Sequence, residues 1–161
     1  MTTEVVLPLL QEECILPALH ASSREDALQQ MSEYLVQRDY CHPTYPAAIL
    51  ARERAYPSGL PFAGEKVAIP HTDAVHVRTP VLLIGRLAQP VIFHTMGNPE
   101  ETIEVRLIVM MALHHAIPAG NVLQALISLF QDEAMMLRLM DSTERAGMYH
   151  VLHTALGEVQ D

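Results

Sequence analysis

The histidine at position 71 directly follows a short apolar run and a proline. Val67, Ala68 and Ile69 predict a brief buried strand, which Pro70 must end because proline cannot donate to a sheet ladder. His71 is therefore expected just past the carboxyl end of a strand, where open α/β sheets place their ligands. Neutral imidazole is abundant near neutral pH, so a histidine held there is a candidate nucleophile or general base.

Three polar residues follow His71 closely. Thr72 and Asp73 supply a hydroxyl and a carboxylate that could orient or polarise the ring. His76 raises a second possibility, because histidine and aspartate are zinc ligands. Zinc signatures place their ligands at fixed spacings on a defined element, and His71-x-Asp73-x-x-His76 matches none of them. We therefore predict no metal site, and a metal-dependent hydrolase built on these three residues remains an alternative.

Two adjacent histidines follow a long apolar run. Residues 103–113 begin with alternating apolar and charged residues and become wholly apolar, which predicts a strand that starts half exposed and ends buried. If this strand runs parallel to residues 67–70, one of the two rings can approach His71. Adjacent strand residues point to opposite faces, so at most one of them does. His114 is the candidate; the alternative is that His114 and His115 only end the strand and contact water.

Composition restricts the classes of protein to consider. The 161 residues suit one domain with one substantial core. Half of the residues are hydrophobic, which argues against disorder. A net charge of −9 disfavours nucleic acid, which needs a basic face, but leaves protein partners open. No apolar run approaches the ~18 residues of a membrane span. Without a secretory leader, Cys14 and Cys41 are expected to be reduced thiols in a cytoplasmic protein.

Two helices are expected before His71. Ser22-Ser23-Arg24-Glu25-Asp26 holds two overlapping capping boxes, so a helix should begin there and run to about residue 40. A second helix should run from about residue 44 to about residue 56, with Arg52 in its last turns. Residues 1–21 mix apolar patches with prolines and predict one short strand and a loop.

After His71 the pattern predicts strands and then helices. Strands are expected at 81–87, 91–93 and 103–113, with a loop over 94–101. The helices expected after Pro118 are one with a common apolar face, one capped by Asp132 and one starting at 141–144; the apolar face is formed by Leu123, Leu126, Ile127 and Phe130. With no repeat and no long linker, we predict a single α/β domain over residues 1–161, a mixed central sheet with helices on both faces.

Several of these segments, taken in order, resemble a known family. The chain is similar to the IIA components of the bacterial phosphoenolpyruvate-dependent sugar phosphotransferase system (type 2) in Arg52-Glu53-Arg54-Ala55-Tyr56-Pro57-Ser58-Gly59-Leu60, in Ile69-Pro70-His71-Thr72-Asp73, in Pro90-Val91-Ile92-Phe93 and in Met96-Gly97. The likeness is to the fructose/mannitol class and, within it, to the galactitol type. It extends over nearly the whole chain.

The resemblance implies a cytoplasmic phosphocarrier, a phosphotransferase component that works through a phosphohistidine. In this family a histidine accepts a phosphoryl group from HPr and passes it to a cysteine of a IIB component, and the membrane IIC component is involved only indirectly. By motif that histidine is His71, and Arg52 corresponds to an arginine near the phosphorylated ring. No cofactor or metal is implied. Many relatives carry a second histidine after the long strand; that position aligns near Ala119, so His114 is the candidate to replace it.

The chemistry of these residues agrees with this role. Phosphoryl transfer needs little beyond in-line positioning and charge stabilisation, and the planar guanidinium of Arg52 suits phosphate oxygens. Arg52 could instead be a surface cation favoured by the dipole of its helix. Thr72 is a further candidate to line the site. The alternative function is a regulatory IIA-like module whose phosphorylation state is read by a transcription or kinase partner; neighbouring IIB and IIC genes would favour transport.

Overall fold

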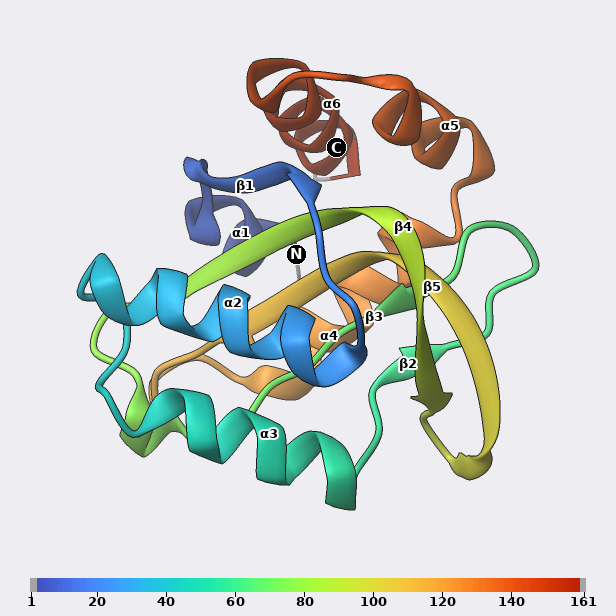
Figure 1. Ribbon diagram of the computed structural model, residues 1–161. Coiled ribbons are helices and arrows are strands. Elements are labelled where there is room, and N and C mark those ends of the chain that lie inside the picture. Colours follow the sequence, from blue (N-terminus) through green and yellow to red (C-terminus); the bar gives the residue numbers. More distant parts are fainter. Residues whose placement is uncertain (1–2, 160–161) are drawn as a thin grey trace.

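A mixed five-stranded sheet runs through the centre of the computed structural model, which describes residues 3–159 (Figure 1). The strand order is β1-β4-β2-β3-β5, and β4 also pairs with β5. β1 pairs parallel with β4, β4 pairs antiparallel with β5, and β3 pairs parallel with β5. The bounds are β1 Leu10–Leu19, β2 Gly59–Leu60, β3 Val67–Ala68, β4 Val81–Thr95 and β5 Asn98–Ala112.

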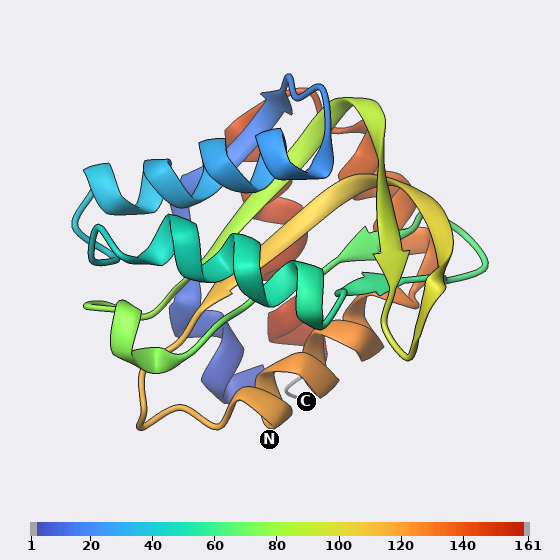
Figure 2. The same cartoon turned by 60° about the horizontal axis from the view of Figure 1, so that its bottom comes forward.

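Helices cover both faces of this sheet, so the predicted α/β architecture is confirmed. On one face lie α2 (Arg24–Gln37) and α3 (Tyr45–Ala55), side by side in Figure 2. The other face carries α1 (Thr3–Val6), α4 (Ala119–Phe130), α5 (Glu133–Asp141) and α6 (Arg145–Val159). Alternation along β4 sends Leu83 into the first apolar layer and Leu82 into the second. Within residues 3–159, no helix combines the length and apolar character needed to cross a bilayer.

The predicted helix starts are confirmed where capping residues mark them. The Oγ of Ser23 accepts a hydrogen bond from the backbone N–H of Asp26 at 3.0 Å, at the start of α2. The carboxylate of Asp132 accepts from the N–H of Met135 at 3.1 Å, at the start of α5. On α4, Leu126 and Phe130 are buried as predicted, whereas the other two predicted positions are only partly buried.

Three strand predictions were wrong. Residues 10–19 form a ten-residue strand after α1 and the short 3-10 helix η1 (Leu7–Leu9), not one short strand and a loop. The predicted strands 81–87 and 91–93 are one strand, because Pro90 lies where the register of β4 against β5 shifts and no ladder donor is needed. The predicted loop 94–101 is a tight turn at Met96-Gly97, where Gly97 has φ +88°. Strand β5 already begins at Asn98.

Two very short strands position the residues around His71. β2 pairs antiparallel with β3 and reaches the end of β4 through Gly59 and Thr95. β3 ends before Pro70, as predicted, and the chain then forms one further bridge between His71 and Met111 of β5. β5 runs half exposed and then fully buried, which confirms the pattern expected for it. His71 therefore follows a strand held between the two arms of the long β4–β5 hairpin.

The close approach of β2 to β4 predicts a sensitive glycine. A Cβ added at Gly59 would lie 2.6 Å from the backbone oxygen of His94, so Gly59→Ala must push β4 away. We expect a loss of about 2 kcal/mol in unfolding free energy, typical of overpacking, measured by urea denaturation. Gly64→Ala is the control, because a Cβ there meets nothing within 4 Å. Equal stability of the two variants would contradict this packing.

Candidate functional site

The ring of His71 is fixed by the backbone that precedes it. The Nδ1 atom lies 3.1 Å from the carbonyl oxygen of Ile69. The backbone N–H of Met111 donates to the carbonyl of Pro70 at 2.9 Å, which anchors the segment to β5. A carbonyl oxygen only accepts, so Nδ1 carries the proton of the neutral ring and Nε2 keeps its lone pair. His71 thus has one fixed nitrogen and one nucleophilic nitrogen.

The surroundings of His71 favour its neutral form. The side chain is half-buried, and this burial is the main reason why its pKa lies below the ordinary value. The hydrogen bond to Ile69 raises the pKa, and the positive charge of Arg52 lowers it again. The net direction is downward. The imidazole is therefore uncharged at neutral pH, which is the state that can attack phosphorus.

Arg52 lies near His71, in the last turn of α3. Its Nη1 atom is 3.8 Å from Oδ1 of Asp73, and its Cζ atom is 4.8 Å from the ring centroid of Tyr56. An exposed ion pair of this kind contributes at most about 1 kcal/mol, so another anion can replace the Asp73 carboxylate. A guanidinium in a weak ion pair beside a neutral imidazole is suited to binding the oxygens of a phosphoryl group.

Thr72 and Asp73 follow His71 directly in the chain. The ring nitrogen Nδ1 contacts the carbonyl of Ile69, and the Asp73 carboxylate faces Arg52. The acceptor that orients the ring through Nδ1 is therefore the backbone carbonyl of Ile69, and an orienting or polarising role for Thr72 or Asp73 stays a prediction. Thr72 is half-buried next to His71 in the chain, and its role in lining the site stays a prediction.

The three residues of the possible metal pattern have separate partners. Nδ1 of His76 lies 2.8 Å from Oγ1 of Thr44, and Asp73 pairs with Arg52. His76 ends the short 3-10 helix η2 (Ala74–His76). Over residues 5–157, no three side chains of histidine, cysteine, aspartate or glutamate gather as a metal site would require.

The second candidate histidine lies past the end of β5. The strand runs parallel to β3, as the approach of His114 to His71 requires, and His71 is paired with Met111. His114 and His115 are both exposed, and their rings meet edge to face with centroids 5.8 Å apart. The participation of His114 in the site stays a prediction.

The two cysteines are free and buried, in agreement with the expected reduced thiols. Burial raises the pKa of Cys14 to about 11 and that of Cys41 to about 12. Both thiols are therefore protonated at neutral pH and are poor nucleophiles.

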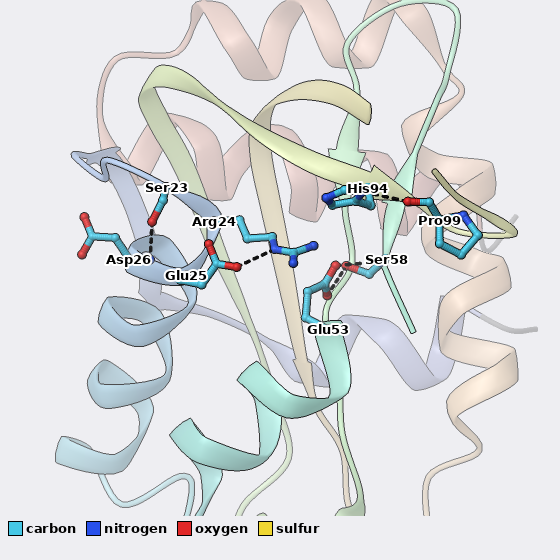
Figure 3. A network of polar contacts seen from close by, with 8 residues as sticks. All are labelled: Ser23, Arg24, Glu25, Asp26, Glu53, Ser58, His94 and Pro99. Carbon is cyan, nitrogen blue, oxygen red and sulfur yellow. Dashed lines mark hydrogen bonds and ion pairs between the residues drawn. The ribbon is translucent and has the colours of Figure 1, made fainter. Parts of the chain in front are cut away.

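The buried carboxylate of Glu53, the residue that follows Arg52 in the chain, was not predicted from the sequence (Figure 3). Glu53 is 2% exposed and accepts two hydrogen bonds from Ser58, from the backbone N–H at 2.8 Å and from Oγ–H at 2.7 Å. Burial raises the pKa of Glu53, and the bonds from Ser58 and the charge of Arg24 oppose this rise. A glutamate in the last turn of a helix, shortly before a Pro-Ser-Gly turn, was the available signal.

A comparison with models of protein families identifies the family of this chain. The model of the family described as "Phosphoenolpyruvate-dependent sugar phosphotransferase system, EIIA 2" matches residues 8–154. The chain belongs to this family. The resemblance inferred from the Arg52–Leu60 and Ile69–Asp73 segments is thereby confirmed, and so is a role in a phosphotransferase system.

Individual relatives agree with this membership. The galactitol-specific EIIA component of Escherichia coli K12 is 23% identical over 108 residues, which cover 67% of this chain and 71% of that protein. The mannitol IIA protein of Escherichia coli, solved in complex with phosphorylated mannitol IIB, has a TM-score of 0.74 at 23% identity, covering 91% of this chain and 99% of that chain. The nitrogen regulatory protein IIA-Ntr of Neisseria meningitidis has a TM-score of 0.68 at 20% identity, covering 91% and 97% of the two chains.

The electrostatics of the site predict the titration of His71. Its pKa, measured by NMR, should lie below the ordinary histidine value in the wild-type protein. Arg52→Met should raise this pKa because it removes a nearby positive charge, but burial should still keep it below the ordinary value.

Arg54→Met is the matched control, since Arg54 is an exposed arginine in the same helical turn. It should leave the titration of His71 unchanged. An ordinary or raised pKa in the wild-type protein, or equal shifts in both variants, would contradict this description of the site.

Proposed function

We propose that this protein is a cytoplasmic phosphocarrier of a sugar phosphotransferase system. His71 accepts a phosphoryl group from HPr and passes it to a cysteine of a IIB component, and the membrane IIC component is reached only through IIB. The observation that carries the proposal is the free Nε2 of a neutral, half-buried His71 beside Arg52. Family membership supports it, as do the galactitol-specific relative and the structure of a mannitol IIA–IIB complex.

The geometry accounts for both transfer steps. The Nε2 lone pair of His71 attacks the phosphorus of the donor phosphohistidine, and the donor N–P bond breaks as the new one forms. The proton on Nδ1 stays in place, so the phosphorylated ring becomes cationic and its bond to the Ile69 carbonyl becomes charge-assisted. A cysteine thiolate of IIB then attacks the same phosphorus and returns the neutral ring. No proton leaves His71 in either step, and the scheme needs no metal or nucleotide.

Arg52 supplies the charge stabilisation in this scheme. It exchanges the exposed Asp73 carboxylate for the phosphoryl oxygens when the donor arrives. It forms that pair again after the group has left. Because Arg52 exchanges one anionic partner for another, it binds the phosphoryl group only weakly. The group can therefore be passed on rather than retained.

A regulatory module is the second candidate. The nitrogen regulatory protein IIA-Ntr has the same fold, and such a module would accept a phosphoryl group in the same first step. The second step separates the two functions. A phosphocarrier for transport passes the group to a purified galactitol-type IIB protein, whereas a regulatory module retains it.

The first step can be tested by intact-mass measurement. Incubation with phosphoenolpyruvate, enzyme I and HPr should add one phosphoryl group to the wild-type protein and none to His71→Ala. His76→Ala is the control, because His76 bonds to Thr44, and it should still be phosphorylated. Phosphorylation of His71→Ala would contradict the proposal.

The initial rate of phosphorylation of the wild-type protein should fall as pH drops through the lowered pKa of His71, because protonation removes the Nε2 lone pair.

The role of His114 has its own test. If its ring donates to the phosphoryl oxygens, His114→Ala should slow phosphotransfer at least several-fold under the same conditions. His115→Ala is the control, because it removes the neighbouring exposed histidine, which is not the candidate. An unchanged rate in His114→Ala would remove His114 from the site.

A further inference from the structure

A continuous series of hydrogen bonds connects a buried carboxylate on α3 to the ring of His71. Glu53 accepts from the backbone N–H of Ser58 at 2.8 Å and from its Oγ–H at 2.7 Å. The carbonyl of Ser58 accepts from the N–H of Ile69 at 3.1 Å. The carbonyl of Ile69 accepts from Nδ1–H of His71, also at 3.1 Å. The series joins the end of α3, the start of β2 and the end of β3.

Each connection is constrained by its surroundings. Glu53 and Ser58 are each 2% exposed, and Ile69 is fully buried. The bond between Ser58 and Ile69 extends the antiparallel pairing of β2 and β3 by one position beyond Gly59 and Ala68. A displacement of Ser58 therefore displaces the Ile69 carbonyl, and with it the acceptor that selects the protonated nitrogen of His71.

The orientation of the Glu53 carboxylate is itself fixed. Each of its two oxygens receives one donor from Ser58. Figure 3 shows Arg24 reaching from the start of α2 toward this carboxylate, while its Nε donates to Glu25 at 2.8 Å. His94 lies above Ser58 in the same view, and its Nδ1 is held 2.7 Å from the carbonyl of Pro99. The positive charge of Arg24 favours the ionised form of Glu53.

We propose that Glu53 is a positioning residue for phosphoryl transfer, which acts through Ser58 and Ile69 to hold His71 as the Nδ1–H tautomer with Nε2 free. The inference rests on the proposed function of His71. Glu53 is also the next residue after Arg52, so the anchor that sets the ring fixes the end of the helix that carries the guanidinium. One buried carboxylate thus sets the relative positions of the phosphoryl acceptor and its countercharge.

A purely structural role would make Glu53 only a clamp between α3 and β2. Its loss would then lower stability without changing which nitrogen of His71 is protonated. The tautomer and the transfer rate, compared at equal folded fraction, separate the two roles.

The test measures the ¹⁵N shifts of His71 at neutral pH, together with the rate of phosphoryl transfer from phosphorylated HPr. Ser58→Ala and Glu53→Ala should each raise the population of the Nε2–H tautomer of His71. Each should also slow acceptance of the phosphoryl group, by about 10-fold, as expected when a reacting group is misplaced. Glu53→Gln should fall between Glu53→Ala and the wild-type protein, because its amide oxygen still accepts from one Ser58 donor.

Ser32→Ala is the matched control. Ser32 is fully buried and its Oγ donates to Leu28 at 2.7 Å within α2, so this variant also loses a buried serine hydrogen bond. It should lower the midpoint of unfolding and leave the tautomer and the rate unchanged. If Glu53→Ala does not fold, Glu53→Gln and Ser58→Ala carry the test.

Two results would overturn the inference: folded Ser58→Ala and Glu53→Gln proteins with the wild-type tautomer and rate, or an equal change of tautomer in Ser32→Ala. A wild-type protein that takes up no phosphoryl group would instead contradict the proposed function. The tautomer measurement needs no phosphoryl donor, so the two failures are distinguishable.

Discussion

The hydrogen bond between Nδ1 of His71 and the carbonyl of Ile69 determines what the site can do. A histidine on a surface loop exchanges its proton between two nitrogens, and either can act as the nucleophile. Here the chain turns at Pro70 immediately after β3, and the ring folds back onto the carbonyl two residues earlier. This contact gives the two nitrogens different tasks: one keeps its proton and the other presents its lone pair.

The rest of the fold keeps that contact in place and tunes its chemistry. The long β4–β5 hairpin pairs with the two short strands β2 and β3. His71 follows β3, at the carboxyl end of that strand. Burial of the ring is sufficient to lower its pKa, yet the side chain stays half exposed, as the proposed transfer between two other proteins requires. Among the side chains that the structure describes, Arg52 forms an ion pair only with the exposed carboxylate of Asp73, so its positive charge is available to the phosphoryl group of the proposed function.

Features that depend on local sequence were predictable. The apolar run before Pro70 placed His71 after a strand, and Ser23 and Asp132 marked helix starts that the structure confirms. Features that depend on distant partners were not. Strand β4 continues through Pro90 because a shift of register against β5 accommodates it. The partner of the His71 ring and the clamp between Glu53 and Ser58 are close in the chain, but they depend on how the side chains turn back onto neighbouring backbone, which residue spacing does not report.

The central claim is that the phosphoryl group is carried on Nε2 of His71 because the Ile69 carbonyl holds the proton on Nδ1. Correlation of ³¹P with ¹⁵N in the phosphorylated, ¹⁵N-labelled protein tests this claim directly. The account predicts a single ³¹P signal coupled to Nε2 of His71, with Nδ1 still protonated. A phosphorus atom bonded to Nδ1, or to a side chain other than that of His71, would contradict it.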